Sequence, residues 1–174
     1  MLALGSNLGD REASIAAAVA DLAAEPGIRV AAVSSLVETP ALKPAGVDRA
    51  APAYLNAVAI VETVLDPHAL LAVANRIEAA HGRVREEHWG DRTLDIDIVD
   101  YAGRTLADDR LTLPHPHAAQ RAFVLAPWFE LEPDAVLTGH GHIAELLART
   151  TDEVAPYQPH DTSVPDSRRE GDHS

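Results

Sequence analysis

Cysteine is absent from the 174 residues of the chain. This absence excludes a disulfide framework and any metal site that uses thiolate ligands. The chain also lacks an apolar run long enough to cross a membrane, and it shows no signal-peptide pattern. We therefore expect a cytoplasmic protein with no membrane partner.

Positive charge is scarce as well. The chain carries 14 lysine and arginine residues against 27 aspartate and glutamate residues, for a formal net charge of −13. Binding to a nucleic-acid backbone requires a basic surface, so this composition argues against nucleic acid but not against a small phosphate ligand. Any one arginine alone is best interpreted as a solvated surface residue, but a cluster in an acidic protein favours an anion site. Half of the basic residues form such a cluster in the sequence: Arg76, Arg83, Arg85, Arg92, Arg104, Arg110 and Arg121.

Hydrophobic residues make up 47% of the chain, which is enough for one domain with a packed core. We assign residues 1–150 to this domain and expect a monomer. Residues 151–174 are polar and interrupted by prolines. Because such a segment cannot bury enough apolar surface to order itself, we expect a disordered tail.

Hydrophobic periodicity predicts the order strand, helix, strand, strand, helix, strand. The helix after the third strand has the clearest start, because Asp66 can cap it and Pro67 suits its first position. This order is typical of an α+β fold, here a ferredoxin-like α/β sandwich with a mainly antiparallel sheet and extra strands. The predicted strands cover residues 1–4, 28–37, 54–65 and 93–101, with short strands at 105–106 and 111–113. The predicted helices cover residues 10–24, 67–81, 127–131 and 143–148.

Two segments are expected to be irregular. Residues 38–46 contain two prolines, which remove backbone donors from a strand, so we expect a surface loop there. Residues 82–91 are polar, carry arginines and lack periodicity. Their position between a helix end and a strand suits a mobile lid over a charged substrate.

The stretch from Trp89 to Ile98 carries the most specific chemistry. In the predicted strand, Asp95 and Asp97 share one face, while Leu94 and Ile96 share the other, because side chains alternate along a strand. Two neighbouring carboxylates repel each other unless a cation lies between them. Oxygen ligands of this kind suit Mg²⁺, so the pair predicts a metal site for phosphate chemistry.

Other polar residues leave alternatives open. His115 and His117 lie in a Pro-His-Pro-His turn, where exposed imidazoles on a rigid turn are the ordinary interpretation, and a zinc site would need a third ligand. Asn56 lies in an apolar strand and needs a hydrogen-bond partner if it is buried. The residues alone favour a structural Asn56 over a ligand contact.

Several stretches over residues 3–148 match one family pattern. The run from Arg92 to Asp97 with the downstream Pro114-His115 is its specific part. On these residues the chain resembles the 6-hydroxymethyl-7,8-dihydropterin pyrophosphokinases (HPPK) of folate biosynthesis. The matching stretches are Gly5-Ser6-Asn7, Glu38-Thr39-Pro40, Tyr54-Leu55-Asn56, Gly82-Arg83-Val84-Arg85, Trp89-Gly90, Arg92-Thr93-Leu94-Asp95-Ile96-Asp97, Leu113-Pro114-His115 and Arg121-Ala122-Phe123.

The resemblance implies transfer of the terminal diphosphate of ATP to the hydroxymethyl group of the pterin, with release of AMP. It implies that Asp95 and Asp97 bind two Mg²⁺ ions that bridge the ATP phosphates. Arg92 matches a loop arginine that acts mainly in binding, and Arg83 matches one that acts mainly in the chemical step. Such a division fits phosphoryl chemistry, in which positioning and cation clamps do most of the work.

The resemblance also implies substrate contacts. Asn56 offers both a donor and an acceptor, which the aminopyrimidinone edge of a pterin requires, so the resemblance reverses the structural interpretation of this residue. The implied ATP contacts are Arg85, His115 and Arg121 near the phosphates, Leu71, Asn75, Glu78, Ile98, Arg110 and Thr112 near the adenine and ribose, and also Trp89. The implied pterin contacts are Thr39, Pro40, Leu42, Tyr54, Asn56 and Phe123.

Three positions depart from the family pattern. His88 replaces an arginine of some members, Asp91 a common proline, and Pro116 a tyrosine that can contact ATP. Two other functions share the Asp-x-Asp pattern or the fold: another Mg²⁺-dependent nucleotidyl or glycosyl transferase, and a non-catalytic ferredoxin-like module that binds a nucleotide.

Overall fold

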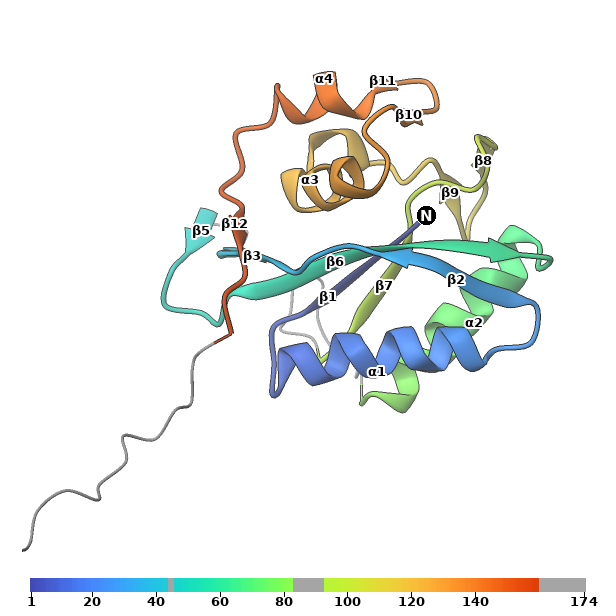
Figure 1. The fold of residues 1–174 in the computed structure, drawn as a ribbon, viewed down its shortest axis with the longest axis horizontal. Coiled ribbons are helices and arrows are strands. Elements are labelled where there is room, and N and C mark those ends of the chain that lie inside the picture. The colour runs from blue at the N-terminus through green and yellow to red at the C-terminus, as the bar shows by residue number, and fades with distance from the viewer. Residues whose placement is uncertain (44–45, 83–92, 160–174) are drawn as a thin grey trace, which may run out of the picture.

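The computed structural model describes residues 1–43, 46–82 and 93–159. Its central strand, β6 (Tyr54–Thr63), pairs antiparallel with β1 (Leu2–Ser6), β2 (Ile28–Val33) and β3 (Val37–Thr39). β1 also pairs with β7 (Asp95–Ile98), and β3 pairs with β12 (Ala155–Pro156), again antiparallel. The resulting sheet order is β12-β3-β6-β1-β7, with β2 joined to β6 (Figure 1).

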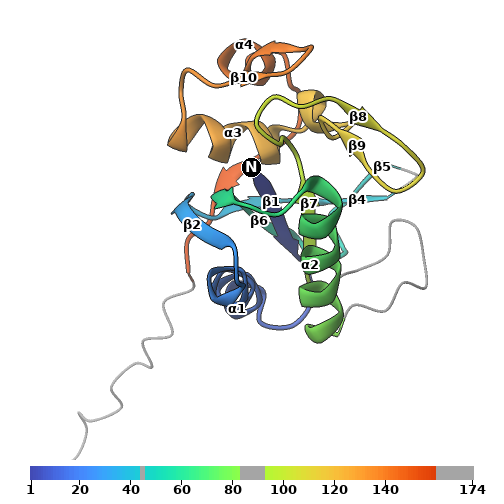
Figure 2. The same cartoon turned by 90° about the vertical axis from the view of Figure 1, so that its right-hand side faces the viewer.

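Helices cover both faces of this sheet, so the sheet lies between helical layers (Figures 1 and 2). α1 (Arg11–Ala24) and α2 (Pro67–Ala80) form the first layer. α3 (Ala122–Leu131) covers the other face, and the short α4 (Ile143–Leu147) packs on α3 on the side away from the sheet. The predicted α+β sandwich with a mainly antiparallel sheet is therefore confirmed.

Both helices of the first layer begin with an aspartate cap, and the cap at Asp66 is the one that the sequence predicted. Asp10 Oδ1 accepts the Ala13 N–H at 3.0 Å, and Asp66 Oδ1 accepts the Ala69 N–H at 2.8 Å. Each bond satisfies a backbone donor that the first helical turn leaves unpaired. The apolar stripes behind these caps face the sheet, where Leu22 and Leu70 are buried.

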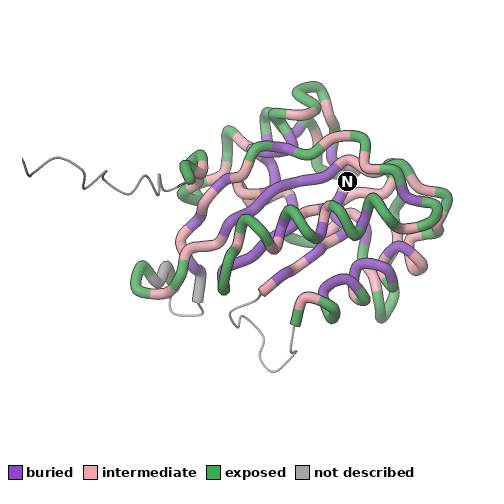
Figure 3. The backbone as a smooth tube through the Cα atoms, turned by 60° about the horizontal axis from the view of Figure 1, so that its bottom comes forward, coloured by how far each residue is buried: buried purple, intermediate pink, exposed green. Residues whose placement is uncertain are grey.

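The alternating pattern of the strands divides the core in two. One cluster lies between the sheet and α1 and α2 and includes Leu4, Leu55 and Ile96. The other lies between the sheet and α3 and includes Val58 and Trp128. In Figure 3 the buried residues follow the strands, whereas the outer sides of the helices are exposed. Within the described part of the chain, no helix has the length and apolar composition needed to cross a membrane.

The expected single strand over residues 28–37 is wrong, because β2 and β3 are separate. The register against β6 shifts between Val30 and Ala32, and the strand ends at Val33. Ser34 then bonds Val58 of β6 twice: its N–H donates to Val58 O at 3.0 Å, and its Oγ accepts the Val58 N–H at 3.0 Å. A bulge and a side-chain bond therefore bend the chain between two strands that share one edge of β6.

The expected irregular loop over residues 38–46 is also wrong. β3 extends to Thr39, and a hairpin of β4 (Ala41–Lys43) and β5 (Gly46–Asp48) follows Pro40. Pro40 lies between two strands, where its missing N–H costs no ladder bond. The remaining small elements are β8 (Leu106–Ala107), β9 (Thr112–Leu113), the 3-10 helix η1 (Ala118–Gln120), β10 (Val136–Leu137) and β11 (Gly141–His142).

The C-terminal segment differs from the expected tail in its first residues. β12 pairs with β3, and the Tyr157 N–H donates to Leu36 O at 3.0 Å. Residues 151–159 thus lie on the domain, because backbone bonds to a sheet edge can order a segment that has little apolar surface of its own. The disorder expected for residues 160–174 lies outside the described residues.

Glu78 links α2 to the carboxylate strand. Its side chain is 2% exposed, and Oε1 accepts the Ile96 N–H at 2.7 Å. We expect Glu78→Ala to lower the free energy of unfolding by about 1–3 kcal/mol, because the Ile96 donor stays buried without this acceptor. Glu78→Gln retains an acceptor oxygen and should lose clearly less. Urea unfolding measures both variants, and equal losses would contradict the assigned hydrogen bond.

Candidate active site

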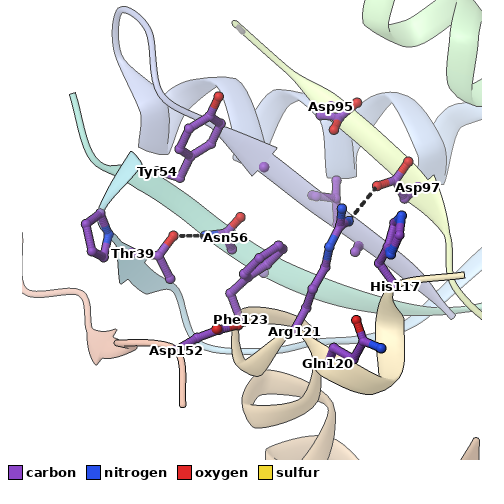
Figure 4. Close-up of a pocket in the computed structure, with 15 residues that line it drawn as sticks. Thr39, Tyr54, Asn56, Asp95, Asp97, His117, Gln120, Arg121, Phe123 and Asp152 are labelled. Carbon is purple, nitrogen blue, oxygen red and sulfur yellow. Dashed lines mark hydrogen bonds and ion pairs between the residues drawn. The ribbon is translucent and has the colours of Figure 1, made fainter. Parts of the chain in front are cut away.

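A cavity of about 380 Å³ lies between the sheet and the first turn of α3 (Figure 4). It opens on the face of the sheet opposite α1 and α2. Residues Ala3 and Gly5 of β1, which have little or no side chain, line part of the cavity. The lining residues are Ala3, Leu4, Gly5, Thr39, Pro40, Tyr54, Asn56, Ala57, Asp95, Asp97, His117, Gln120, Arg121, Phe123 and Asp152.

The two carboxylates of β7 face this cavity. Their neighbours Leu94, Ile96 and Ile98 are buried, so the predicted alternation of faces is confirmed. Asp95 pairs with Gly5 of β1 and Asp97 pairs with Ala3. Because these partners have little or no side chain, they leave open space beside both carboxylates.

The Arg121 guanidinium and the His115 imidazole both lie near Asp97. Its Oδ2 lies 3.9 Å from Arg121 Nη1 and 3.7 Å from His115 Nε2. Both distances exceed hydrogen-bond lengths, so the groups are close without being tightly paired. The Arg121 guanidinium also lies 5.6 Å from the centre of the Phe123 ring, which holds it over the cavity.

His115 is neutral near pH 7. Burial is the main cause that lowers its pKa from 6.5 to about 4, and the charges of Arg121 and His117 act in the same direction while Asp95 opposes them. His115 Nδ1 accepts the His117 N–H at 3.2 Å, so the proton of the neutral ring lies on Nε2. The Nε2–H therefore points toward the side of the cavity that contains Asp97.

This pKa predicts a pH dependence of stability in the protein without metal or nucleotide. Between pH 6.5 and about pH 4 the unfolded chain binds a proton at His115 that the folded chain does not, so stability falls as the pH falls through this range. We expect His115→Gln to remove about 1 kcal/mol of the loss between pH 7 and pH 5, after allowance for the partly exposed ring. Urea unfolding in the presence of a chelator measures this difference.

A matched control is His140→Gln, since His140 is exposed on the turn between β10 and β11. This control should leave the loss of stability unchanged. Equal pH dependence of the His115 variant and the natural chain would contradict the assignment.

The other part of the cavity surrounds the side-chain amide of Asn56 on β6. Asn56 is 5% exposed, and its Nδ2 donates to Thr39 Oγ1 at 3.1 Å. A Cβ atom on Gly5 would lie 3.1 Å from Asn56 Oδ1, so glycine leaves the space that this oxygen occupies. Tyr54 and Phe123 flank the amide in Figure 4. Asn56 thus has the hydrogen-bond partner expected for a buried asparagine, which is Thr39, and the Asn56 amide also borders the cavity.

The structure brings only part of the predicted site together. The predicted residues that line the cavity are Thr39, Pro40, Tyr54, Asn56, Asp95, Asp97, Arg121 and Phe123, and His115 adjoins it through Asp97. Arg83, Arg85, Trp89, Arg92 and the lid assigned to residues 82–91 lie outside the described residues, apart from Gly82. The Leu42 side chain is also outside the described part of the structure.

The predicted adenine and ribose contacts do not line this cavity. Leu71, Asn75 and Glu78 lie on α2, on the opposite face of the sheet, and Ile98 is buried in the cluster beneath α1 and α2. Two further residues, Arg110 and Thr112, are exposed on and beside the β8–β9 hairpin. Their assignment to the nucleotide stays a prediction.

The sequence patterns missed other residues of the cavity wall. The sequence predicts only an exposed imidazole on a turn for His117, and no pattern singles out Gln120 or Asp152. Asp152 lies in the segment assigned to the tail. The local sequence there cannot show that this residue contacts the start of α3. The proximity of Gln120 to the arginine and phenylalanine of the family motif is the one signal that could have found it.

Asp95 and Asp97 are the described residues best suited to hold a metal. Among residues 1–43, 46–82 and 93–159, no group of three or more His, Cys, Asp or Glu side chains could hold an ion by itself. A pair of carboxylates facing open space fits Mg²⁺ nonetheless, since this ion keeps water and substrate phosphates as its remaining ligands.

Comparison with known proteins agrees with this geometry. The model of the family 7,8-dihydro-6-hydroxymethylpterin-pyrophosphokinase (HPPK) matches residues 1–133. The chain is 49% identical over 148 residues to the 2-amino-4-hydroxy-6-hydroxymethyldihydropteridine pyrophosphokinase of Methylorubrum extorquens, covering 85% of this chain and 90% of that protein. It is 38% identical over 151 residues to the Haemophilus influenzae protein of the same name, covering 87% of this chain and 92% of that protein.

A crystal structure of Plasmodium falciparum HPPK-DHPS shares the fold, with a TM-score of 0.63 and 15% identity. This match covers 84% of the present chain and 44% of that longer chain. The resemblance noted from the sequence motifs is thus confirmed by the family model and by relatives that align over most of their length. The chain belongs to the 7,8-dihydro-6-hydroxymethylpterin-pyrophosphokinase (HPPK) family.

Proposed function

We propose that this chain transfers the terminal diphosphate of ATP to the hydroxymethyl group of 6-hydroxymethyl-7,8-dihydropterin and releases AMP, in folate biosynthesis. A single cavity joins the carboxylate pair and Arg121 to the Asn56 amide and its aromatic neighbours Tyr54 and Phe123, and this juxtaposition carries the proposal. Family membership supports the same reaction.

Asp95 and Asp97 are proposed to hold two Mg²⁺ ions between the protein and the ATP phosphates. Bound there, Mg²⁺ neutralises phosphate charge and holds the reacting groups in place. Arg121 supplies a permanent positive charge on the same side of the cavity. His115 supplies a neutral N–H donor at Nε2, and neutrality keeps this ring from competing with a cation for the carboxylates.

The pocket at Asn56 is proposed to bind the pterin ring. Tyr54 and Phe123 offer aromatic surfaces for a flat heterocycle, and the Asn56 amide offers a donor and an acceptor to its edge. Thr39 fixes the orientation of that amide through the bond at 3.1 Å, and Pro40 completes the wall. Orientation by a second side chain limits the motion of the amide before substrate binds.

The reaction forms a bond between the hydroxymethyl oxygen and the β-phosphorus of ATP. The bond from that phosphorus to the oxygen shared with the α-phosphate breaks, AMP leaves with that oxygen, and the hydroxyl proton is released. Negative charge shifts toward the leaving AMP, so the groups near Asp97 that carry positive charge or N–H donors stabilise the transition state. The pocket at Asn56 contributes by holding the hydroxymethyl group near the phosphates.

The remaining assigned residues belong to the same proposal. Arg83 is assigned to the chemical step and Arg92 to phosphate binding, and the backbone near Leu42 is assigned to the pterin edge. The proposed nucleotide contacts are Arg85, Trp89, Leu71, Asn75, Glu78, Ile98, Arg110 and Thr112. We also propose that the chain works as a monomer in the cytoplasm and binds no nucleic acid; light scattering and gel-shift measurements test the monomer and the absence of nucleic-acid binding.

Product analysis tests the reaction. The purified chain is incubated with ATP, Mg²⁺ and the hydroxymethyl pterin, and nucleotides are separated by chromatography. We expect AMP and the pterin diphosphate in equal amounts, and no AMP without the pterin. Formation of ADP or free pyrophosphate would instead indicate another Mg²⁺-dependent transferase, and ATP binding without turnover would indicate a non-catalytic module.

A further inference from the structure

The segment between α4 and β12 contributes Asp152 to the cavity wall, 30 residues away in sequence from the helix it contacts. Asp152 Oδ2 accepts the Ala122 N–H at 3.2 Å. Ala122 is the first residue of α3, and its two neighbours Arg121 and Phe123 both line the cavity (Figure 4). A contact at this N–H therefore acts on both side chains.

α3 lacks a local cap. Arg121 occupies the cap position, and within the described part of the chain its side chain makes no capping hydrogen bond. An unpaired N–H at a helix start favours a nearby carboxylate, both as an acceptor and through the helix dipole. Asp152 supplies this group from outside the helix.

Separate contacts fix the position of Asp152. Downstream, β12 pairs with β3, and the Tyr157 ring lies 5.9 Å from the Arg11 guanidinium. That guanidinium donates to Glu38 Oε1 at 2.7 Å and to Ala53 O at 2.6 Å, so the segment is joined to α1, β3 and the residue before β6. Figure 1 shows the chain running from α4 down past the sheet edge at β12.

We propose that Asp152 is a positioning residue of the pterin pocket, which holds the first turn of α3 so that Phe123 and Arg121 stay over the cavity. This inference rests on the proposed function. Asp152 acts through the Ala122 N–H and makes no bond to the reacting atoms. The C-terminal segment, which lies beyond the family match at residues 1–133, thereby becomes part of the substrate site.

The test compares Asp152→Ala with Asp152→Asn. We expect Asp152→Ala to raise the KM for the hydroxymethyl pterin about 5- to 10-fold, the loss expected for a missing cap, with kcat changed less than KM. Asp152→Asn keeps an oxygen that can accept the Ala122 N–H, so it should restore most of the pterin affinity. A purely structural role would instead lower the active fraction, which reduces kcat and leaves KM unchanged.

Glu153→Gln is the matched control. Glu153 pairs with Arg49 at 2.6 Å on the exposed side of the same segment and does not line the cavity. This variant should leave the pterin KM within about twofold, as usual for an exposed ion pair. An unchanged KM in Asp152→Ala, or an Asp152→Asn variant as weak as Asp152→Ala, would overturn the positioning role; the second result would indicate a direct contact of the charge with substrate.

Hydrogen exchange of the Ala122 amide separates this inference from the proposed function. Exchange should accelerate in Asp152→Ala and return toward the natural rate in Asp152→Asn, whether or not the chain turns over ATP. An unchanged exchange rate would overturn the contact itself. A natural chain that makes no AMP with the pterin, yet shows this exchange pattern, would refute the proposed reaction and leave the contact at Ala122 standing.

Discussion

Replacing Asp97 with alanine is expected to reduce formation of AMP from ATP and the pterin by about 10²- to 10³-fold, the scale of losing one preorganised electrostatic group at a transition state. The carboxylate faces the cavity within 4 Å of both Arg121 and His115, and it is one of two groups proposed to hold Mg²⁺. The fold should survive, because the side chain is 38% exposed and belongs to neither core cluster. Steady-state kinetics with AMP detection measures the loss.

Two control variants test whether the loss of activity depends on the charge and the position of the Asp97 carboxylate. Asp97→Asn keeps the shape of the side chain but removes its charge, and it should be nearly as inactive if the carboxylate binds a cation. Asp134→Ala removes an exposed carboxylate outside the cavity and should leave turnover unchanged. Full activity of the Asp97→Ala variant would remove the proposed metal site.

Replacing Asn56 with leucine is expected to lower kcat/KM for the pterin by about 10²- to 10⁴-fold, because a site built to hydrogen-bond its substrate loses most when that bond is removed. Leucine keeps the branched shape of the side chain, with bulkier methyl groups, and removes both the donor and the acceptor of the amide. The affinity for an ATP analogue should change little, since Asn56 lies on β6 and β1 separates it from β7, which carries Asp97 (Figure 4). Calorimetry with each ligand separates the two effects.

Variants of Thr39 provide the matched control. Thr39 Oγ1 accepts the Asn56 Nδ2–H, so Thr39→Ser preserves the bond and should bind pterin within about threefold, whereas Thr39→Val should weaken binding by about the worth of one hydrogen bond. If Asn56→Leu binds the pterin as tightly as the natural chain, the pocket assignment is wrong.

Local patterns predicted the elements whose stability is mainly local. The cap at Asp66 predicted the start of α2, because a cap bond spans only three residues, and the apolar periodicity alone predicted α1. The alternation along β7 likewise predicted that Asp95 and Asp97 share a face, since side chains in a strand alternate without help from the rest of the fold.

Elements that depend on partners were predicted less well. β2 and β3 were joined in the prediction because residues 28–37 are continuously suited to a strand, and only pairing with β6 shows the bulge and the bond at Ser34. The segment from β3 to β5 was assigned to a loop because of its prolines, although Pro40 lies between strands rather than within one. Residues 155–156 form a strand only through their pairing with β3.

For the site, motif spacing in the sequence was enough to identify the family and the carboxylate pair. It also identified Asn56 as a residue that needs a partner. Tertiary structure decided which side chains share a cavity: it placed Asp152 at α3, buried Glu78 behind Ile96, and put the α2 residues on the opposite face of the sheet. These placements join residues 18 or more positions apart, and backbone periodicity carries no record of contacts at such separations.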